Sequence, residues 1–340
     1  MTSRERIRNI VSRTPADRCG FWLGNPHPDT LPIYYAYFGV ATLEELHRKL
    51  GSDFRWITPQ FFDDVYQSPD GKGLFDMWKY KHSLGEAGPL AECETVEEID
   101  RYAWPDLRYL HFDECLAALG SAGDVYRASG FWAPFFHDVM DLFGVEEFMV
   151  KMHTSPAVIE AALEHVCRFY LEANEMFYRK ADTMVDACFF GNDFGTQREL
   201  MIHPDQFDRF MLPWISRFAA QARAHGYQTL LHSCGSVHRV IDRLIFAGIE
   251  CLHPLQALAH NMDAAQLARD FGGRISFLGG IDTQDLLVNG TPAAIRDEVR
   301  RLADTLGPHL IISPSHEALL PNVPPANVAA MAEAAITLGR

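Results

Sequence analysis

Basic residues are few in this sequence: 30 lysines and arginines stand against 45 aspartates and glutamates. The formal net charge is therefore −15 at pH 7. Nucleic acids and anionic membrane surfaces attract proteins through patches of positive charge, so this balance argues against both as binding partners. We expect the excess of negative charge to serve solubility.

Long apolar runs are also missing, since none reaches the roughly 18 residues needed to span a bilayer. The first six residues, Met1 to Arg6, are charged and lack the apolar stretch of a signal peptide. The seven cysteines are odd in number and show no CxxC spacing, which is typical of free thiols in a reducing compartment. We therefore expect a soluble cytoplasmic protein without disulfide bonds.

Several catalytic motifs are absent as well. No GxGxxG or GxxxxGK[ST] loop follows an expected strand, which argues against the common nucleotide-binding folds. No GxSxG sequence predicts a serine hydrolase, and nothing indicates flavin or pyridoxal phosphate. No linker or change of composition divides the chain, so we expect residues 1–340 to form a single domain.

What the sequence does contain is a regular alternation of short apolar runs with helical stretches. The runs predict eight buried strands at 19–24, 54–58, 125–130, 185–190, 229–231, 250–252, 275–278 and 309–312. The helices are expected at 3–13, 42–50, 95–99, 112–119, 136–150, 156–181, 207–222, 237–245, 264–271, 292–306 and 328–338. This order favours an α/β fold, a (β/α)8 TIM barrel with an N-terminal extension and a polar insertion over 63–105 after the second strand. An open, doubly wound sheet is the alternative.

Polar residues follow these strands, and the C-terminal ends of the strands carry the active site in barrels of this kind. The most informative are His232 and Cys234, which are two residues apart and so point the same way in an extended strand. Nitrogen and sulfur together are a donor set that zinc prefers, and His316 after the last strand could supply a third ligand. Packing inside the barrel is the alternative for this pair. His27, Asp193, His253 and Asp282 also lie at strand ends, where turns or helix caps could equally account for them.

Beyond these patterns, the sequence resembles the uroporphyrinogen decarboxylase superfamily over nearly its whole length. The resemblance rests on Gly88-Pro89-Leu90-Ala91, Thr95–Ile99, Trp104-Pro105-Asp106, Asn192–Gln197, His203-Pro204, His232–Gly235, Pro254-Leu255-Gln256, Asn261-Met262-Asp263, Gly279–Asp282 and Pro321–Val328. It implies the same (β/α)8 barrel. True decarboxylases of this superfamily grip their polycarboxylate substrate with arginines after the first strand, where this sequence reads Leu23-Gly24-Asn25-Pro26-His27-Pro28. Uroporphyrinogen is therefore not the expected substrate.

The resemblance is closer to the zinc-dependent methyltransferases of the superfamily, which hold zinc with His-x-Cys and a later cysteine. It implies zinc on His232, Cys234 and His316, with His316 in place of the usual cysteine. It also implies a corrinoid (cobalamin) carried by a partner protein, and a small thiol, folate or methoxylated or methylated compound as methyl donor or acceptor.

Asp193 and His316 are the catalytic candidates within this resemblance. The expected substrate-binding residues are His27, Trp132, Phe194, His253 and Asp282. The alternative is a cofactor-free decarboxylase or lyase acting on a smaller acid, and a third reading is a non-catalytic binding barrel. The sequence is compatible with a homodimer but does not decide the oligomeric state.

Overall fold

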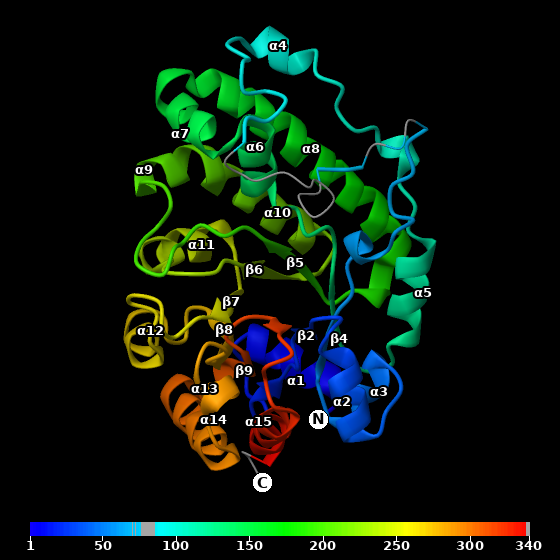
Figure 1. Ribbon diagram of the computed structural model, residues 1–340, viewed down its shortest axis with the longest axis vertical. Helices are drawn as coiled ribbons and strands as arrows, with labels where there is room; N and C mark the ends of the chain where they lie inside the picture. Colours follow the sequence, from blue (N-terminus) through cyan, green and yellow to red (C-terminus); the bar gives the residue numbers. More distant parts are fainter. Residues whose placement is uncertain (70, 72, 76–85, 338–340) are drawn as a thin grey trace.

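Eight short strands run parallel around one barrel in the computed structural model, which describes residues 1–69, 71, 73–75 and 86–337 (Figure 1). The barrel strands are β1 (Gly20–Phe21), β3 (Phe54–Trp56), β4 (Tyr126–Ser129), β5 (Ala187–Gly191), β6 (Gln228–His232), β7 (Cys251–Leu255), β8 (Ser276–Ile281) and β9 (Leu310–Pro314). They pair in the order β1-β9-β8-β7-β6-β5-β4-β3. The amide of Asp53 donates to the carbonyl oxygen of Phe21 at 2.8 Å and so links the two ends of this order. The predicted (β/α)8 barrel is confirmed.

All eight predicted strands are present, because each is an apolar run that is buried on both faces, inside the barrel and under the helices. A small second sheet was not predicted. In it β2 (Asn25–Pro26) pairs in parallel with β10 (Ala318–Leu319). This pairing brings the loop after β1 against the loop after β9, and both loops border the site described below.

Helices surround the barrel (Figure 1). They are α1 (Ser3–Val11), α2 (Leu31–Phe38), α3 (Leu43–Lys49), α4 (Val96–Asp100), α5 (Asp113–Ser121), α6 (Phe135–Phe143), α7 (Val145–Thr154), α8 (Pro156–Ala181), α9 (Pro204–Gln206), α10 (Leu212–Ala224), α11 (Ile241–Ala247), α12 (Ala264–Phe271), α13 (Leu286–Asn289), α14 (Pro292–Leu306) and α15 (Pro325–Thr337). Short 3₁₀ turns cover 59–61, 107–109, 182–184, 238–240 and 307–309, and a π-helical turn covers Phe207–Met211.

Some helix boundaries differ from the prediction. The helix expected at 136–150 is two helices, α6 and α7, which meet at Gly144. Helix α5 continues through Gly120, where a stop was expected, and α2 was not predicted at all. The helix expected at 207–222 begins as the π-helical turn, and Pro213 lies in the first turn of α10. Thr42, Thr95 and Thr291 cap α3, α4 and α14, each by accepting a hydrogen bond from a backbone amide.

The N-terminal extension closes the barrel at the end opposite the site. Ile7, Ile10 and Val11 of α1 pack into the barrel interior together with large side chains such as Trp22 and Phe189. Two buried aspartates hold α1 in place through ion pairs: Asp186 pairs with Arg4 and Arg8, and Asp53 pairs with Arg6. Both aspartates directly precede a barrel strand, so these pairs lie at the N-terminal ends of the strands.

The insertion after β3 carries α4 on its outer part, as expected from the sequence. Residues 70, 72 and 76–85 of this predicted insertion lie outside the described residues. In the described part of the chain, no helix is both long enough and apolar enough to cross a membrane.

Candidate metal centre and adjoining cavity

His232 ends strand β6, and Cys234 follows it in the first turn of the next loop. Gly235 makes this sharp turn feasible because its φ is +81° and a β-carbon there would lie 2.5 Å from backbone atoms of Gly195 and Thr196. The Ser233 hydroxyl accepts a hydrogen bond from the amide of Phe194, which fixes the loop after β5 beside it. The His-Ser-Cys-Gly sequence thus places two side chains of types that can ligate a metal at the C-terminal mouth of the barrel.

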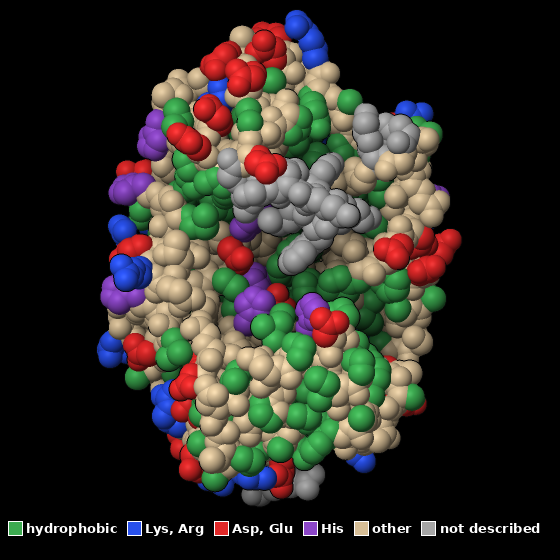
Figure 2. All heavy atoms as spheres, in the orientation of Figure 1, with side chains coloured by type: hydrophobic (Ala, Val, Ile, Leu, Met, Phe, Trp, Pro, Cys, Tyr) green, Lys and Arg blue, Asp and Glu red, His purple; other side chains and the backbone are tan. Residues whose placement is uncertain are grey.

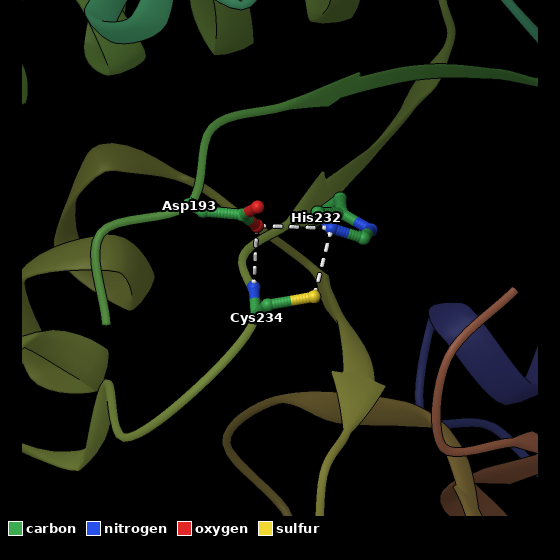
Figure 3. A group of neighbouring side chains, drawn as sticks. All are labelled: Asp193, His232 and Cys234. Carbon is green, nitrogen blue, oxygen red and sulfur yellow. Dashed lines mark hydrogen bonds and ion pairs between the residues drawn. The ribbon is translucent and has the colours of Figure 1, made fainter. Parts of the chain in front are cut away.

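Three donor atoms converge at this point (Figure 3). His232 Nε2 lies 3.1 Å from Asp193 Oδ1 and 3.3 Å from Cys234 Sγ. The backbone amide of Cys234 donates to the same Asp193 oxygen at 2.9 Å, which holds the carboxylate in position. Zinc–ligand bonds of about 2.0 to 2.3 Å in a tetrahedral site put ligand atoms roughly 3.3 to 3.8 Å apart. The His232 nitrogen therefore lies from the oxygen and from the sulfur at almost the distances found between zinc ligands, all three atoms lie within 4.8 Å of one another, and their chemistry fits that ion.

The other ring nitrogen of His232 faces the barrel interior. Its Nδ1 lies 2.9 Å from His253 Nδ1 and 3.6 Å from Glu317 Oε2. His253 is fully buried, and its ring meets Trp22 and Phe189 edge to face, surroundings in which an Nε2–H can contact a π face. With its proton on Nε2, His253 accepts at Nδ1 from His232 Nδ1–H. That arrangement occupies Nδ1 of His232 and leaves Nε2, whose proton a metal would displace, directed at Cys234 and Asp193.

The electrostatic field at this point favours a cation. Burial by itself lowers the pKa of His232, but the charges of Glu317 and Cys234 and the hydrogen bond to Asp193 outweigh it and raise the pKa well above its usual value. Burial raises the pKa of Asp193, yet the hydrogen bond and charge of His232 hold the net pKa well below its usual value. Burial, followed by the charge of His232, lowers the pKa of His253, which stays neutral. Negative charge therefore concentrates around His232.

His316, the third ligand expected from the sequence, lies next to this group. A hydrogen bond to Cys234 is the main cause that raises its pKa, and its ring centroid lies 6.5 Å from that of His232. Its Nδ1 accepts a hydrogen bond from the amide of Ala318 at 3.1 Å. An accepting Nδ1 puts the proton of the neutral ring on Nε2, which makes that atom a donor rather than a ligand. The described residues bring Asp193, instead of His316, to ligand spacing with His232 and Cys234.

Beside this group is a cavity of about 720 Å³, within the usual range for small-molecule sites. Two predicted substrate-binding residues, His27 and Trp132, line it, and the Trp132 ring packs against His232 with centroids 5.0 Å apart. Glu317 also lines it and so connects the cavity with His232. Figure 2 shows histidine and acidic side chains gathered in a hollow in the middle of the face of the molecule that it draws.

The structure gives other roles to three predicted substrate-binding residues. Phe194 is fully buried and packs against Phe136 and Phe207, so it belongs to the core and not to the cavity wall. Asp282 accepts hydrogen bonds from the amides of Gln284, Asp285 and Leu286. Its carboxylate therefore caps the turn that leads into α13. His253 has no exposed surface through which it could contact a substrate, and it contacts His232 instead.

Two residues of the site were missed by the sequence reasoning. Glu317 follows His316 directly, but its place beside His232 depends on the pairing of β2 with β10, which has no sequence signal. His47 lies on α3 among charged residues and looks like part of a solvated face, yet only 4% of it is exposed and it lines the cavity. A histidine in the last turn of a short helix carries no pattern that would have identified it.

Three comparisons place these features among known proteins. The family model described as uroporphyrinogen decarboxylase (URO-D) matches residues 129–338, which is more than half of the chain. The chain matches no curated protein sequence. Among solved structures, it is similar to a methyltransferase from Methanosarcina mazei, with a TM-score of 0.69 and 17% sequence identity over 99% of this chain and 98% of that one.

Proposed function

Because the chain belongs to the uroporphyrinogen decarboxylase family, we propose that it is a zinc-dependent methyltransferase on the barrel common to that family. In this proposal it moves a methyl group between a corrinoid carried by a partner protein and a small thiol, folate, or methoxylated or methylated compound. The fold it shares with a methyltransferase is compatible with this activity. Fold alone does not determine function, so the proposal depends on the site.

The observation that carries the proposal is the convergence of His232 Nε2, Cys234 Sγ and Asp193 Oδ1 at the mouth of the barrel. A catalytic zinc site needs three protein ligands and one open position for a substrate. His232 and Cys234 supply two ligands. We assign the third to Asp193, because its oxygen already lies at ligand spacing and because His316 Nδ1 is engaged by the Ala318 amide.

Zinc bound there would supply a Lewis acid that lowers the pKa of a thiol or polarises a methoxyl oxygen. The residues of this chain would orient the ligands, exclude water and donate a proton. His253 and Glu317 fix the orientation of the His232 ring, and the amide of Cys234 holds Asp193. The ring of Trp132 covers His232 and excludes water from it. His316, whose pKa is raised mainly by its hydrogen bond with Cys234, would donate a proton or hydrogen bond to a group bound at the open position.

Metal content of the purified protein tests this function. The wild type is expected to hold about one zinc per chain, and the Cys234→Ser variant is expected to lose it. Cys93→Ser is the matched control, since Cys93 is also a partly exposed free cysteine but is not part of the site. A wild type that takes up no zinc when zinc is offered, or a Cys234→Ser variant that keeps both metal and activity, would overturn the proposal.

The family itself supports one second candidate, a metal-free decarboxylase or lyase acting on a small acid. In that case His316 and Asp193 would be the proton donor and the electrostatic stabiliser. Activity that survives a strong chelator would favour this reading. A protein that binds its partner tightly without turnover of any methyl donor or acid would be a non-catalytic barrel.

A further inference from the structure

The cavity beside His232 has an aromatic wall. Trp56 contacts both Phe61 and Trp132, with ring centroids 4.7 Å apart in each pair. Phe61 remains 52% exposed although it is large and apolar, and the surface it presents borders the cavity. Flat ligands bind well against such faces, because ring stacking adds to the burial of apolar area.

The same cavity offers no free lysine or arginine side chain among its described lining residues. Arg55 lines it, but its guanidinium donates to both oxygens of Glu44 and to the carbonyl oxygens of Ser52 and Phe54. Glu317 adds a negative charge on the side nearest His232. A ligand carboxylate would therefore lose its hydration without gaining an ion pair. The occupant is expected to be uncharged.

Among the described lining residues, three side chains have a buried polar atom without a hydrogen-bond partner: His47 Nδ1, Trp56 Nε1 and Glu317 Oε2. His47 of α3 is 4% exposed, its Nδ1 has no hydrogen-bond partner, and no described residue hydrogen bonds to the rest of its ring. Burial, with a smaller effect from Arg55, lowers the pKa of His47 well below its usual value, so the ring is neutral and offers one N–H donor and one acceptor. A buried polar group without a partner costs stability, and a ligand oxygen that satisfied it would recover that cost.

We propose that this cavity binds a neutral small molecule with a flat ring and one hydroxyl or carbonyl oxygen, which stacks on the Trp56–Phe61–Trp132 wall and hydrogen bonds to His47. Glu317 and Trp132 border both the cavity and His232, so a substituent on the ring can reach the metal-ligand group. That this molecule is the methyl donor or acceptor rests on the proposed function, whereas its binding does not. His47 is then a specificity-determining residue for the ring.

Calorimetric titration of the full-length protein with three probes tests the proposal. 2-Methoxyphenol carries the ring and the hydroxyl, methoxybenzene lacks the hydroxyl, and 2-methoxybenzoate adds a charge. We expect 2-methoxyphenol to bind roughly three- to tenfold more tightly than methoxybenzene, the effect of one neutral hydrogen bond. The benzoate is expected to bind at least roughly tenfold more weakly than the phenol. Absence of binding by both neutral probes, or tighter binding of the benzoate, would overturn the proposal.

Variants of the wall identify the contacts. His47→Phe keeps a ring of similar size, so it should bind both neutral probes equally, while His47→Gln should keep a preference for the phenol. Phe61→Ser should weaken both probes at least roughly threefold. A preference for the phenol that survives in a folded His47→Phe variant would contradict the role of His47. The same titration with Cys234→Ser separates the two proposals, because probe binding should persist there even if zinc and methyl transfer are lost.

Discussion

The Nδ1 atoms of His232 and His253 face each other across 2.9 Å, at positions that are in register on the adjacent strands β6 and β7. One of these atoms must donate and the other accept, so the contact selects a tautomer for each ring. With His232 as the donor, its Nε2 is the ring nitrogen left to face Cys234 and Asp193. We therefore expect His253, a residue with no exposed surface, to influence metal binding on the exposed side of the site.

Replacement of His253 by phenylalanine should therefore weaken zinc binding without removing a ligand. The variant preserves the size of the ring but leaves His232 Nδ1 without its acceptor, and loss of such a partner typically lowers metal affinity 10- to 100-fold. Competition with a chromophoric chelator measures the affinity. His47→Phe is the control, since it is also a buried histidine but does not contact His232. Equal zinc affinity in His253→Phe and wild type would contradict this role.

The two candidates for the third ligand can be separated by a matched pair of variants. Asp193→Asn keeps the shape and the contact with the Cys234 amide but removes the charge, and it should lower zinc affinity at least roughly tenfold. His316→Gln should keep zinc, because His316 Nδ1 is committed to the Ala318 amide. The opposite result, zinc kept in Asp193→Asn and lost in His316→Gln, would restore the ligand set that the sequence predicts.

The N-terminal helix provides a test of stability away from the site. Asp186 has no exposed side-chain surface and pairs with Arg4 and Arg8, so Asp186→Ala leaves these arginines without their partner at the base of the barrel. We expect a loss of about 3 to 5 kcal/mol in the free energy of unfolding. Asp297→Ala breaks an exposed ion pair with Arg300 and should cost less than about 1 kcal/mol. Chemical denaturation compares the two, and similar losses would show that α1 is not held in this way.

The sequence was sufficient to predict the barrel. Each strand is a short apolar run that can be recognised from its own residues, without knowing which segments pack against it. The sequence also predicted that His232 and Cys234 lie side by side, although β6 ends at His232 and the turn before Gly235, not a shared strand face, brings Cys234 to it. It could not predict Glu317 or His47. The position of Glu317 depends on a two-residue pairing between chain segments about 290 residues apart, and the burial of His47 depends on how α3 packs. Such tertiary contacts leave no periodicity in the chain.

Gly191, the last residue of β5, lies directly under the Trp132 ring. A β-carbon at Gly191 would come within 2.2 Å of the far edge of the indole, and the Gly191 amide donates to the carbonyl oxygen of Trp132 at 2.9 Å. Gly191→Ala must therefore displace the indole, which forms part of the cavity wall and covers His232. We expect about 1 to 3 kcal/mol of destabilisation from this overpacking. Tryptophan fluorescence should shift, and 2-methoxyphenol should bind more weakly.

The control for this last variant is Gly120→Ala in α5. A β-carbon at Gly120 meets only the Met184 sulfur at 4.0 Å, and alanine is favoured over glycine inside a helix by roughly 0.5 to 1 kcal/mol. This variant should be at least as stable as the wild type and should bind the probe equally well. If Gly191→Ala also left probe binding and tryptophan fluorescence unchanged, the indole would not be part of the binding wall. The aromatic part of the wall would then consist of Trp56 and Phe61, with His47 still available for the hydrogen bond.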